Sequence, residues 1–188
     1  MTTIKEDERR NFFRVNDEVY IEFKPISDEE YKAAPETLKN LDDNAFSLSA
    51  DFATLNNSIN PILNNIKQQH PEIGEFLDFI NNKIDSLSQH VLYANSNHIE
   101  QKSIMANMSA SGIQFETSQS FNIQQKMKIK LILLPEKIGI LIYGRVIESR
   151  ENTLSIEFEH LRPEDQELMI KHNLNKQMLE IRENKEND

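Results

Sequence analysis

The sequence contains no cysteine and no tryptophan among its 188 residues. Disulfide bonds, thiolate metal sites and cysteine nucleophiles are therefore excluded, and a reducing compartment is expected. Only four glycines are present, and they never cluster as a phosphate-binding loop or a dinucleotide-binding motif requires. No run approaches the roughly 18 apolar residues of a membrane helix, and the first residues, MTTIKEDERR, include no apolar signal segment. We therefore expect a cytoplasmic protein without a membrane span.

Acidic residues outnumber basic ones, so that the formal net charge is −10. Proteins that bind nucleic-acid polymers normally present a broad basic face, because binding releases counterions from the phosphates. The charge therefore argues against DNA or RNA as a partner and leaves a small phosphate ligand that is held locally. The histidines show no metal-ligand spacing and no Ser, His and Asp set suggests a triad, so neither a metal site nor an enzyme is expected.

Alternation of apolar and polar side chains predicts β-strands at both ends of the chain. One such strand occupies residues 19–23, and further short strands joined by turns fill residues 103–161. About six strands of this kind favour an antiparallel barrel or meander, which we assign to residues 15–30 and 103–161. A helix and tail follow over residues 162–188, with a proline in the first turn of the helix. The expected fold class is α+β.

Between these strands, residues 36–95 carry apolar side chains at helical spacing, which predicts an inserted helical hairpin or coiled coil. The first series is Leu38, Leu41, Ala45, Leu48, Phe52, Leu55, Ile59, Ile62 and Ile66, and the second is Ile73, Leu77, Ile80, Ile84, Leu87 and Val91. Pro61 lies inside the first series and costs a helix about 3 kcal/mol, so a kink or break is expected near Asn60. The two series fit either an internal core or a homo-oligomer, from dimer to tetramer, that assembles through residues 36–92.

Two short motifs carry side chains suited to a guanine-containing phosphate ligand. The first, RRNFFR at residues 9–14, holds three arginines, and an arginine binds phosphate bidentately, stacks on purines and pairs with the edge of guanine. The second, NMSASG at residues 107–112, offers an amide for a base edge, a hydroxyl for phosphate, and a glycine that allows close backbone approach. Each motif by itself is typical of exposed surface or of a turn, and the combination is what indicates a site. The candidate ligand-binding residues are Arg9, Arg10, Arg14, Asn107, Ser109 and Gly112.

At these residues the chain resembles the PilZ family of cyclic di-GMP receptors, whose signature is an RxxxR motif before the first strand and a (D/N)xSxxG motif later. Arg10 and Arg14 match the first motif, with Arg9 as the neighbouring arginine, and residues 107–112 match the second. The resemblance implies a six-stranded antiparallel barrel followed by a helix. It also implies cyclic di-GMP as the ligand, with no cofactor.

The resemblance implies a mechanism in which the arm of residues 1–14 folds across the barrel and clamps the ligand. Ligand binding would then be coupled to an unknown protein effector or to the protein's own conformation. The helical insertion separates the two motifs. If it loops out from one barrel connection, the site is preserved; if it packs over the arm or reorders the strands, the site is lost. The alternative function is a PilZ-like assembly module that binds no ligand and oligomerises through its inserted helices.

Overall fold

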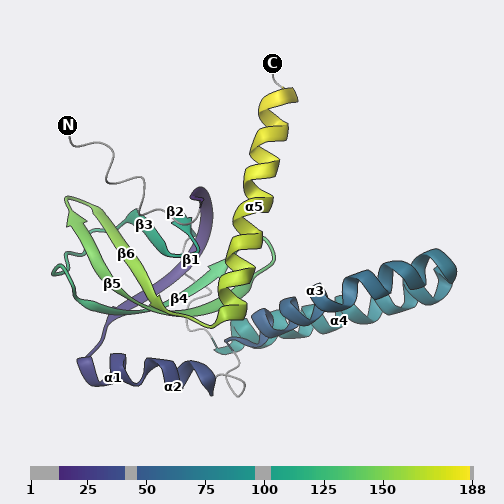
Figure 1. Cartoon of the computed structure of the whole chain (residues 1–188), viewed down its shortest axis with the longest axis horizontal. Helices are drawn as coiled ribbons and strands as arrows, with labels where there is room; N and C mark the ends of the chain where they lie inside the picture. Colours follow the sequence, from purple (N-terminus) through teal and green to yellow (C-terminus); the bar gives the residue numbers. More distant parts are fainter. Residues whose placement is uncertain (1–12, 41–45, 96–102, 187–188) are drawn as a thin grey trace.

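The computed structural model describes residues 13–40, 46–95 and 103–186, and its centre is a closed barrel of six antiparallel strands (Figure 1). Around the barrel the strands follow the order β1-β2-β3-β6-β5-β4. Their bounds are β1 (Val15–Pro25), β2 (Ile104–Ser109), β3 (Gly112–Glu116), β4 (Lys126–Leu133), β5 (Ile138–Arg150) and β6 (Thr153–His160). Helix α5 (Pro163–Glu186) follows the last strand. The prediction of a six-stranded antiparallel barrel with a C-terminal helix is confirmed.

Apolar side chains at alternate strand positions fill the barrel. Met108, Ile129, Ile142 and Ile156 come from four different strands and are all buried inside it. Met169 of α5 joins the same core, so the C-terminal helix is part of the barrel domain. Because alternate side chains of a strand point to opposite faces, the predicted alternation places these residues inside.

Two short helices follow β1 that the sequence pattern did not predict. They are α1 (Asp28–Lys32) and α2 (Ala34–Lys39), and Tyr31 and Leu38 from them pack on Leu141 and Tyr143 of β5. The range 15–30 assigned to the barrel therefore ends in a helix, and Leu38 is not part of the hairpin. The reason is that β5 carries apolar side chains on its outer face, which need a cover.

The insertion is a hairpin of two long helices, α3 (Leu48–Gln69) and α4 (Pro71–Asn95), which projects from the barrel (Figure 1). Helix α3 continues through Pro61, so a break near Asn60 is wrong, and the kink expected as the alternative stays a prediction. Pro61 is exposed, and water can therefore bond to the carbonyl group that loses its helical partner. Within the described ranges, no helix is both long and apolar enough to cross a membrane.

The hairpin leaves the barrel from the connection between β1 and β2, and these two strands still pair with each other. The insertion therefore does not reorder the strands. Its root packs on the outside of the barrel through Phe46, Leu92 and Ile132. There the backbone N–H of Gly139 donates to Ser49 Oγ at 2.9 Å. A Cβ atom on Gly139 would lie 2.5 Å from the Phe46 carbonyl oxygen, so this glycine allows the close approach of the root.

Helices α3 and α4 meet through a partly polar interface. Asn56 Nδ2 donates to Asp85 Oδ1 at 3.0 Å, and Lys67 Nζ lies 2.7 Å from Asp78 Oδ2. Leu63 is buried, although it lies outside the predicted apolar series. The face of α3 that meets α4 therefore includes residues outside the predicted series.

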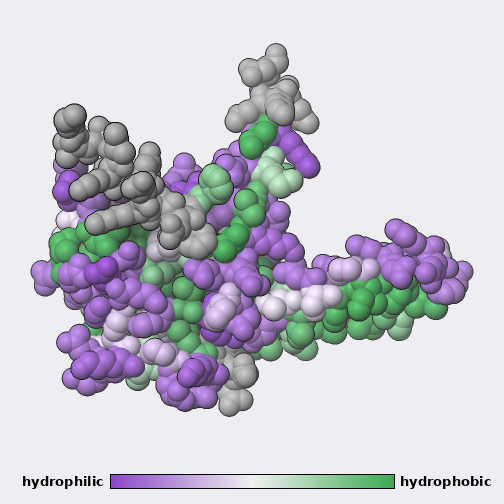
Figure 2. All heavy atoms as spheres, viewed as in Figure 1, coloured by the Kyte–Doolittle hydropathy of each residue, from purple (hydrophilic) through white to green (hydrophobic). Residues whose placement is uncertain are grey.

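Seven of the thirteen described residues in the two predicted apolar series are exposed. We call the set of exposed residues the apolar hairpin face; it consists of Leu55, Ile59, Ile62, Ile73, Phe76, Phe79, Ile80, Ile84 and Leu87. Figure 2 shows apolar side chains gathered along one side of the hairpin. Leu41 and Ala45, which the series also contains, lie outside the described residues. The monomer does not bury this face, and such large exposed apolar patches mark interaction sites.

Candidate functional site

Arg14 and Asn107, one residue from each sequence motif, meet at one end of the β1–β2 pair. Arg14 immediately precedes β1, and Asn107 lies on β2 opposite Asn16. The Arg14 Nε group donates to Asn107 Oδ1 at 2.5 Å, and Arg14 Nη2 donates to the Asn107 carbonyl oxygen at 2.9 Å. The hairpin leaves from the other end of this strand pair, beyond Val19 and its partner Ile104. The insertion therefore leaves the arrangement of the two motif residues intact.

Asn107 is fixed by a second strand contact that the sequence motif did not indicate. Its Nδ2 group donates to Asn16 Oδ1 at 2.8 Å, while its Oδ1 atom accepts from Arg14. Both ends of the Asn107 amide are thus engaged, and the side chain holds the Arg14 guanidinium against the barrel. Asn16 is identified by the register of the two strands. It lies two positions after Arg14 and pairs directly with Asn107.

Ser109 and Gly112 shape the turn between β2 and β3. Ser109 is buried, and its hydroxyl accepts from the backbone N–H of Ser111 at 3.3 Å and donates to the Gly112 carbonyl oxygen at 3.4 Å. A Cβ atom on Gly112 would lie 2.9 Å from the Ile156 carbonyl oxygen, so the glycine is required where β3 approaches β6. The ligand contacts expected of these two residues stay predictions. Arg9 and Arg10 lie outside the described residues.

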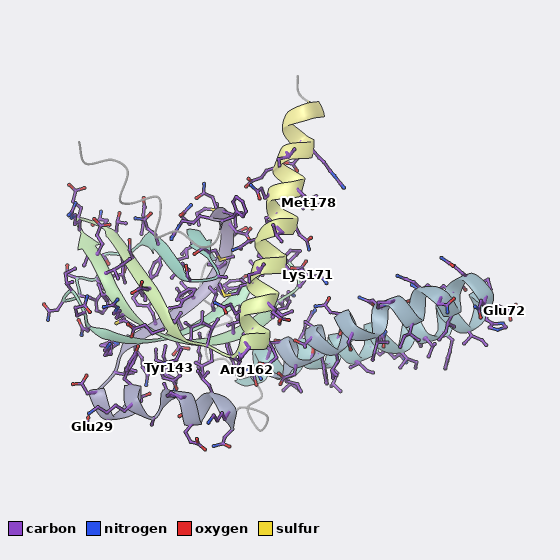
Figure 3. The ribbon with its side chains drawn as sticks, viewed as in Figure 1. Glu29, Glu72, Tyr143, Arg162, Lys171 and Met178 are labelled. Carbon is purple, nitrogen blue, oxygen red and sulfur yellow. The ribbon has the colours of Figure 1, made fainter. Side chains whose placement is uncertain are left out.

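A largely buried arginine joins α5 to the root of the hairpin. Figure 3 places Arg162 where α5 begins beside the barrel. Its Nε and Nη2 groups donate to the two carboxylate oxygens of Asp165 at 2.9 and 2.8 Å, and its Nη1 group lies 2.7 Å from Asp51 Oδ1 on α3. Burial lowers the pKa of Arg162, but the hydrogen bonds and charges of Asp165 and Asp51 outweigh it and raise that pKa above the ordinary value. We call these three residues the Arg162 clamp.

A second polar cluster joins α5 to β1. The Nε2 atom of His172 lies 2.6 Å from Asp17 Oδ2, and Lys176 Nζ lies 2.6 Å from Asp17 Oδ1. Both Asp17 and His172 are buried. We call these three residues the Asp17 clamp. Sequence reasoning missed both clamps, because the partners are charged residues with no local pattern; Asp17 and His172 are 155 positions apart.

The Arg162 clamp makes stability depend on pH through Asp165. Burial raises the pKa of Asp165, and the hydrogen bonds and charge of Arg162 offset only part of this effect. The folded state therefore binds this proton more tightly than the unfolded state, where an aspartate has a pKa of about 3.9. The resulting stabilisation is present at low pH and is lost as the pH rises through the folded-state pKa.

We expect Asp165→Asn, which cannot titrate, to gain stability relative to the wild type as the pH rises. The slope of this difference is at most about 1.4 kcal/mol per pH unit. Urea unfolding between about pH 4 and about pH 7 measures it. Glu167→Gln, at an exposed position of the same helix, is the control. A constant difference between Asp165→Asn and the wild type over this range would contradict the prediction.

Comparisons with known proteins agree with this architecture. Residues 86–174 match the model of the PilZ domain family, a range that runs from α4 through the barrel strands β2 to β6 into α5. A solved structure of a pathogenic protein from Xanthomonas campestris is described as a tetrameric PilZ domain self-assembled via a helical bundle. It superposes with a TM-score of 0.57 at 12% sequence identity, over 91% of this chain and 89% of that chain. The inhibitor of motility of Bacillus subtilis is similar over 43% of this chain and 44% of that chain, at 18% identity and a TM-score of 0.37. No curated protein matches the sequence.

The fold is thus a closed antiparallel barrel whose end is covered by a C-terminal helix. The chain contains a PilZ domain, with a helical hairpin inserted between its first and second strands.

Proposed function

We propose that the protein is a cytoplasmic receptor for cyclic di-GMP that works by binding, not by catalysis. The observation that supports this function most directly is the contact between Arg14 and Asn107, which joins the two motifs on the barrel surface. Arginine binds phosphate and guanine through the same planar group, and cyclic di-GMP offers two of each. PilZ domains belong to a family of cyclic di-GMP receptors, which adds to the case.

In this proposal Arg9 and Arg10 bring the arm over the ligand, while Arg14 is already held against the barrel by Asn107. Ordering a chain segment costs roughly 1–2 kcal/mol per residue, which contacts with the ligand offset. A receptor of this kind therefore adopts different arm conformations with and without the ligand. That difference is what an effector protein reads.

Calorimetric titration with cyclic di-GMP tests the proposal. We expect saturable binding by the wild type and an affinity at least about 100-fold lower for Arg14→Ala, because each charge-assisted hydrogen bond contributes about 1.5–3 kcal/mol. Arg10→Ala tests the arm in the same way. The matched control is Arg150→Ala, which removes an exposed arginine of β5 that forms an ion pair with Glu148 of the same strand.

In this titration, no binding by a correctly folded wild type would refute the receptor function. Binding that Arg14→Ala and Arg150→Ala weaken equally would show that the ligand does not use this motif.

The apolar hairpin face favours a second activity, self-assembly. Burial of one large aliphatic or aromatic side chain contributes about 1.5–3 kcal/mol, and this face exposes a row of them on both helices. A row that follows two antiparallel helices fits the same row on a second hairpin, because both copies then bury the whole face in a helical bundle. The similar Xanthomonas campestris protein is described as a tetrameric PilZ domain self-assembled via a helical bundle. We therefore propose that the protein is a homo-oligomer held by its hairpins.

A further inference from the structure

A hollow of about 620 Å³ lies on the outer face of the barrel beside Asn107. Met105 of β2 and Gln114 and Glu116 of β3 line it, and we call it the β2–β3 hollow. Gln114 pairs directly with Asn107 across the two strands. Met105 lies two positions before Asn107 on β2, so both side chains point to the outer face, about 7 Å apart. The hollow therefore adjoins the contact between Asn107 and Arg14.

The Asn107 amide is already engaged at both ends, so another group must read a base that binds here. Its Oδ1 atom accepts from Arg14, and its Nδ2 group donates to Asn16. The Watson–Crick edge of guanine carries two neighbouring donors, N1–H and N2–H₂. Glu116 can accept from both, because its side chain is exposed and an ionised carboxylate offers two acceptor oxygens and no donor.

Met105 gives the β2–β3 hollow an apolar surface on which a purine can lie. Its side chain is 62% exposed, although the neighbouring Ala106 and Met108 of the same strand are buried. A thioether packs favourably against an aromatic ring. The separation of two strand positions is comparable to the distance from the phosphate to the base of a nucleotide. A ligand whose phosphate meets Arg14 therefore reaches Met105 with its base.

The charge around Met105 decides which part of the ligand enters the hollow. Glu18 of β1 pairs with Met105 across the strands, lies on the exposed face of β1 and accepts a hydrogen bond from Ser103 Oγ. Together with Glu116 it makes this part of the barrel surface acidic. Two carboxylates repel a phosphate but accept hydrogen bonds from the donor edge of a base. The phosphate therefore belongs at Arg14 and the base in the hollow.

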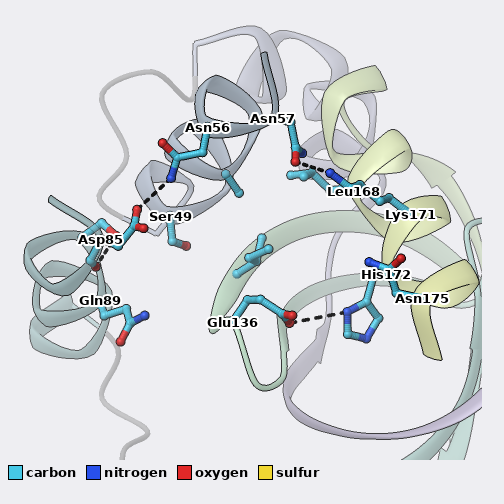
Figure 4. Close-up of a pocket in the computed structure, with 13 residues that line it drawn as sticks. Ser49, Asn56, Asn57, Asp85, Gln89, Glu136, Leu168, Lys171, His172 and Asn175 are labelled. Atoms are coloured by element: carbon cyan, nitrogen blue, oxygen red, sulfur yellow. Dashed lines mark hydrogen bonds and ion pairs between the residues drawn. The ribbon is translucent and has the colours of Figure 1, made fainter. Parts of the chain in front are cut away.

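The cavity between the hairpin and α5 is less suited to a base (Figure 4). It encloses about 390 Å³, and its charged groups are engaged by neighbouring amides. Asp85 accepts from Asn56 at 3.0 Å, and Lys171 donates to Asn57. Among the residues that the structure describes, its lining includes neither an aromatic side chain nor a methionine. A purine therefore finds fewer partners in this cavity than in the β2–β3 hollow.

We propose that the β2–β3 hollow is a guanine subsite and that Glu116 determines the preference for guanine. This inference rests on the proposed function as a cyclic di-GMP receptor. One guanine lies on Met105, and its N1–H and N2–H₂ groups donate to the two carboxylate oxygens of Glu116. Adenine carries an acceptor at N1, so the carboxylate faces a lone pair there and cyclic di-AMP is disfavoured.

Calorimetric titration of the full chain with cyclic di-GMP and with cyclic di-AMP tests the subsite. The key variant is Glu116→Gln, because an amide donates to N1 of adenine and accepts from its N6 group, but offers guanine only one acceptor. We expect this variant to bind cyclic di-GMP about 10-fold more weakly than the wild type and cyclic di-AMP about 3-fold more tightly. A change that only disturbed the barrel surface would weaken both ligands.

Two further variants separate the apolar surface from the carboxylate. Met105→Ala removes the side chain beneath either base, so it is expected to weaken the binding of both nucleotides by about 3- to 10-fold. Glu180→Gln removes the same charge as Glu116→Gln at an exposed position of α5 outside the hollow, and it should bind both nucleotides as the wild type does. Met105 and Glu116 are both exposed, so neither change disturbs the core of the barrel.

The outcomes separate the subsite from the receptor function. Opposite changes in the two affinities of Glu116→Gln, with Glu180→Gln unchanged, are the result that the subsite requires. A wild type that binds both nucleotides equally well would overturn the subsite and leave the receptor function standing, and so would a Glu116→Gln variant whose two affinities are unchanged or fall together. A wild type that does not bind cyclic di-GMP would overturn the receptor function and this inference together.

Discussion

Arg162→Met is expected to lower the free energy of unfolding by about 3–5 kcal/mol, because it removes one partner of a buried ion pair. The side chain of Asp165 is 1% exposed and that of Arg162 is 11% exposed. Without the guanidinium, the Asp165 carboxylate loses two hydrogen bonds and stays in a site from which water is excluded. Methionine keeps much of the apolar stem, so the loss reports on the charge and not on packing.

Chemical unfolding of the wild type, Arg162→Met and a matched surface variant measures this effect. Arg150→Met removes an arginine whose side chain is 83% exposed, and it is expected to change stability by less than about 1 kcal/mol. The double variant Arg162→Met with Asp165→Leu should recover most of the loss, since it removes both buried charges. Equal losses for Arg162→Met and Arg150→Met would show that the Arg162 clamp does not stabilise the fold.

Ile62→Asp is expected to convert the proposed oligomer into monomers. Ile62 is 61% exposed in the single chain, so aspartate is accommodated there by the folded monomer. In a bundle of hairpins the same position is buried, and each copy would then bury a carboxylate without a partner. The cost of several kcal/mol per copy raises the dissociation constant by a factor of about 1,000 or more.

Sedimentation velocity over a range of concentrations measures the assembly, and circular dichroism checks that the helices remain. Asn64→Asp introduces the same charge two residues away, at an exposed polar position of α3 outside the apolar hairpin face. It should leave the assembly unchanged. A wild type that is monomeric at all concentrations, or an oligomer that Ile62→Asp leaves intact, would refute assembly through this face.

Much of the candidate site follows from the sequence. Arg14 and Asn107 were selected as motif residues, and the structure brings them into contact although 93 positions separate them. Ser109 was selected for its hydroxyl, yet that hydroxyl lies in a buried turn. The motif supplies residue types and spacing, but whether a hydroxyl faces the solvent or its own turn depends on the backbone conformation around it.

The long helices, too, are only partly predictable from the sequence. Their existence follows from the spacing of apolar residues, which is a local property of the chain. Their arrangement does not, since Leu63 and Asn56 turn toward α4 whereas Ile59 and Ile62 remain exposed. Helical spacing identifies an apolar side of a helix, but it does not say whether the neighbouring helix or another molecule covers that side.

The sequence by itself determined the strands of the barrel, the helical insertion and the residues of the two motifs. These depend on periodicity and residue type, both of which can be read within a few turns or strands. Only the tertiary structure decided that the insertion leaves from a single connection, that α1 and α2 cover β5, and that the two clamps attach α5 to β1 and to α3. The physical reason is that an isolated charged residue has the same local pattern whether it is solvated or paired. Its partner is set by which distant strands and helices the closed barrel brings together.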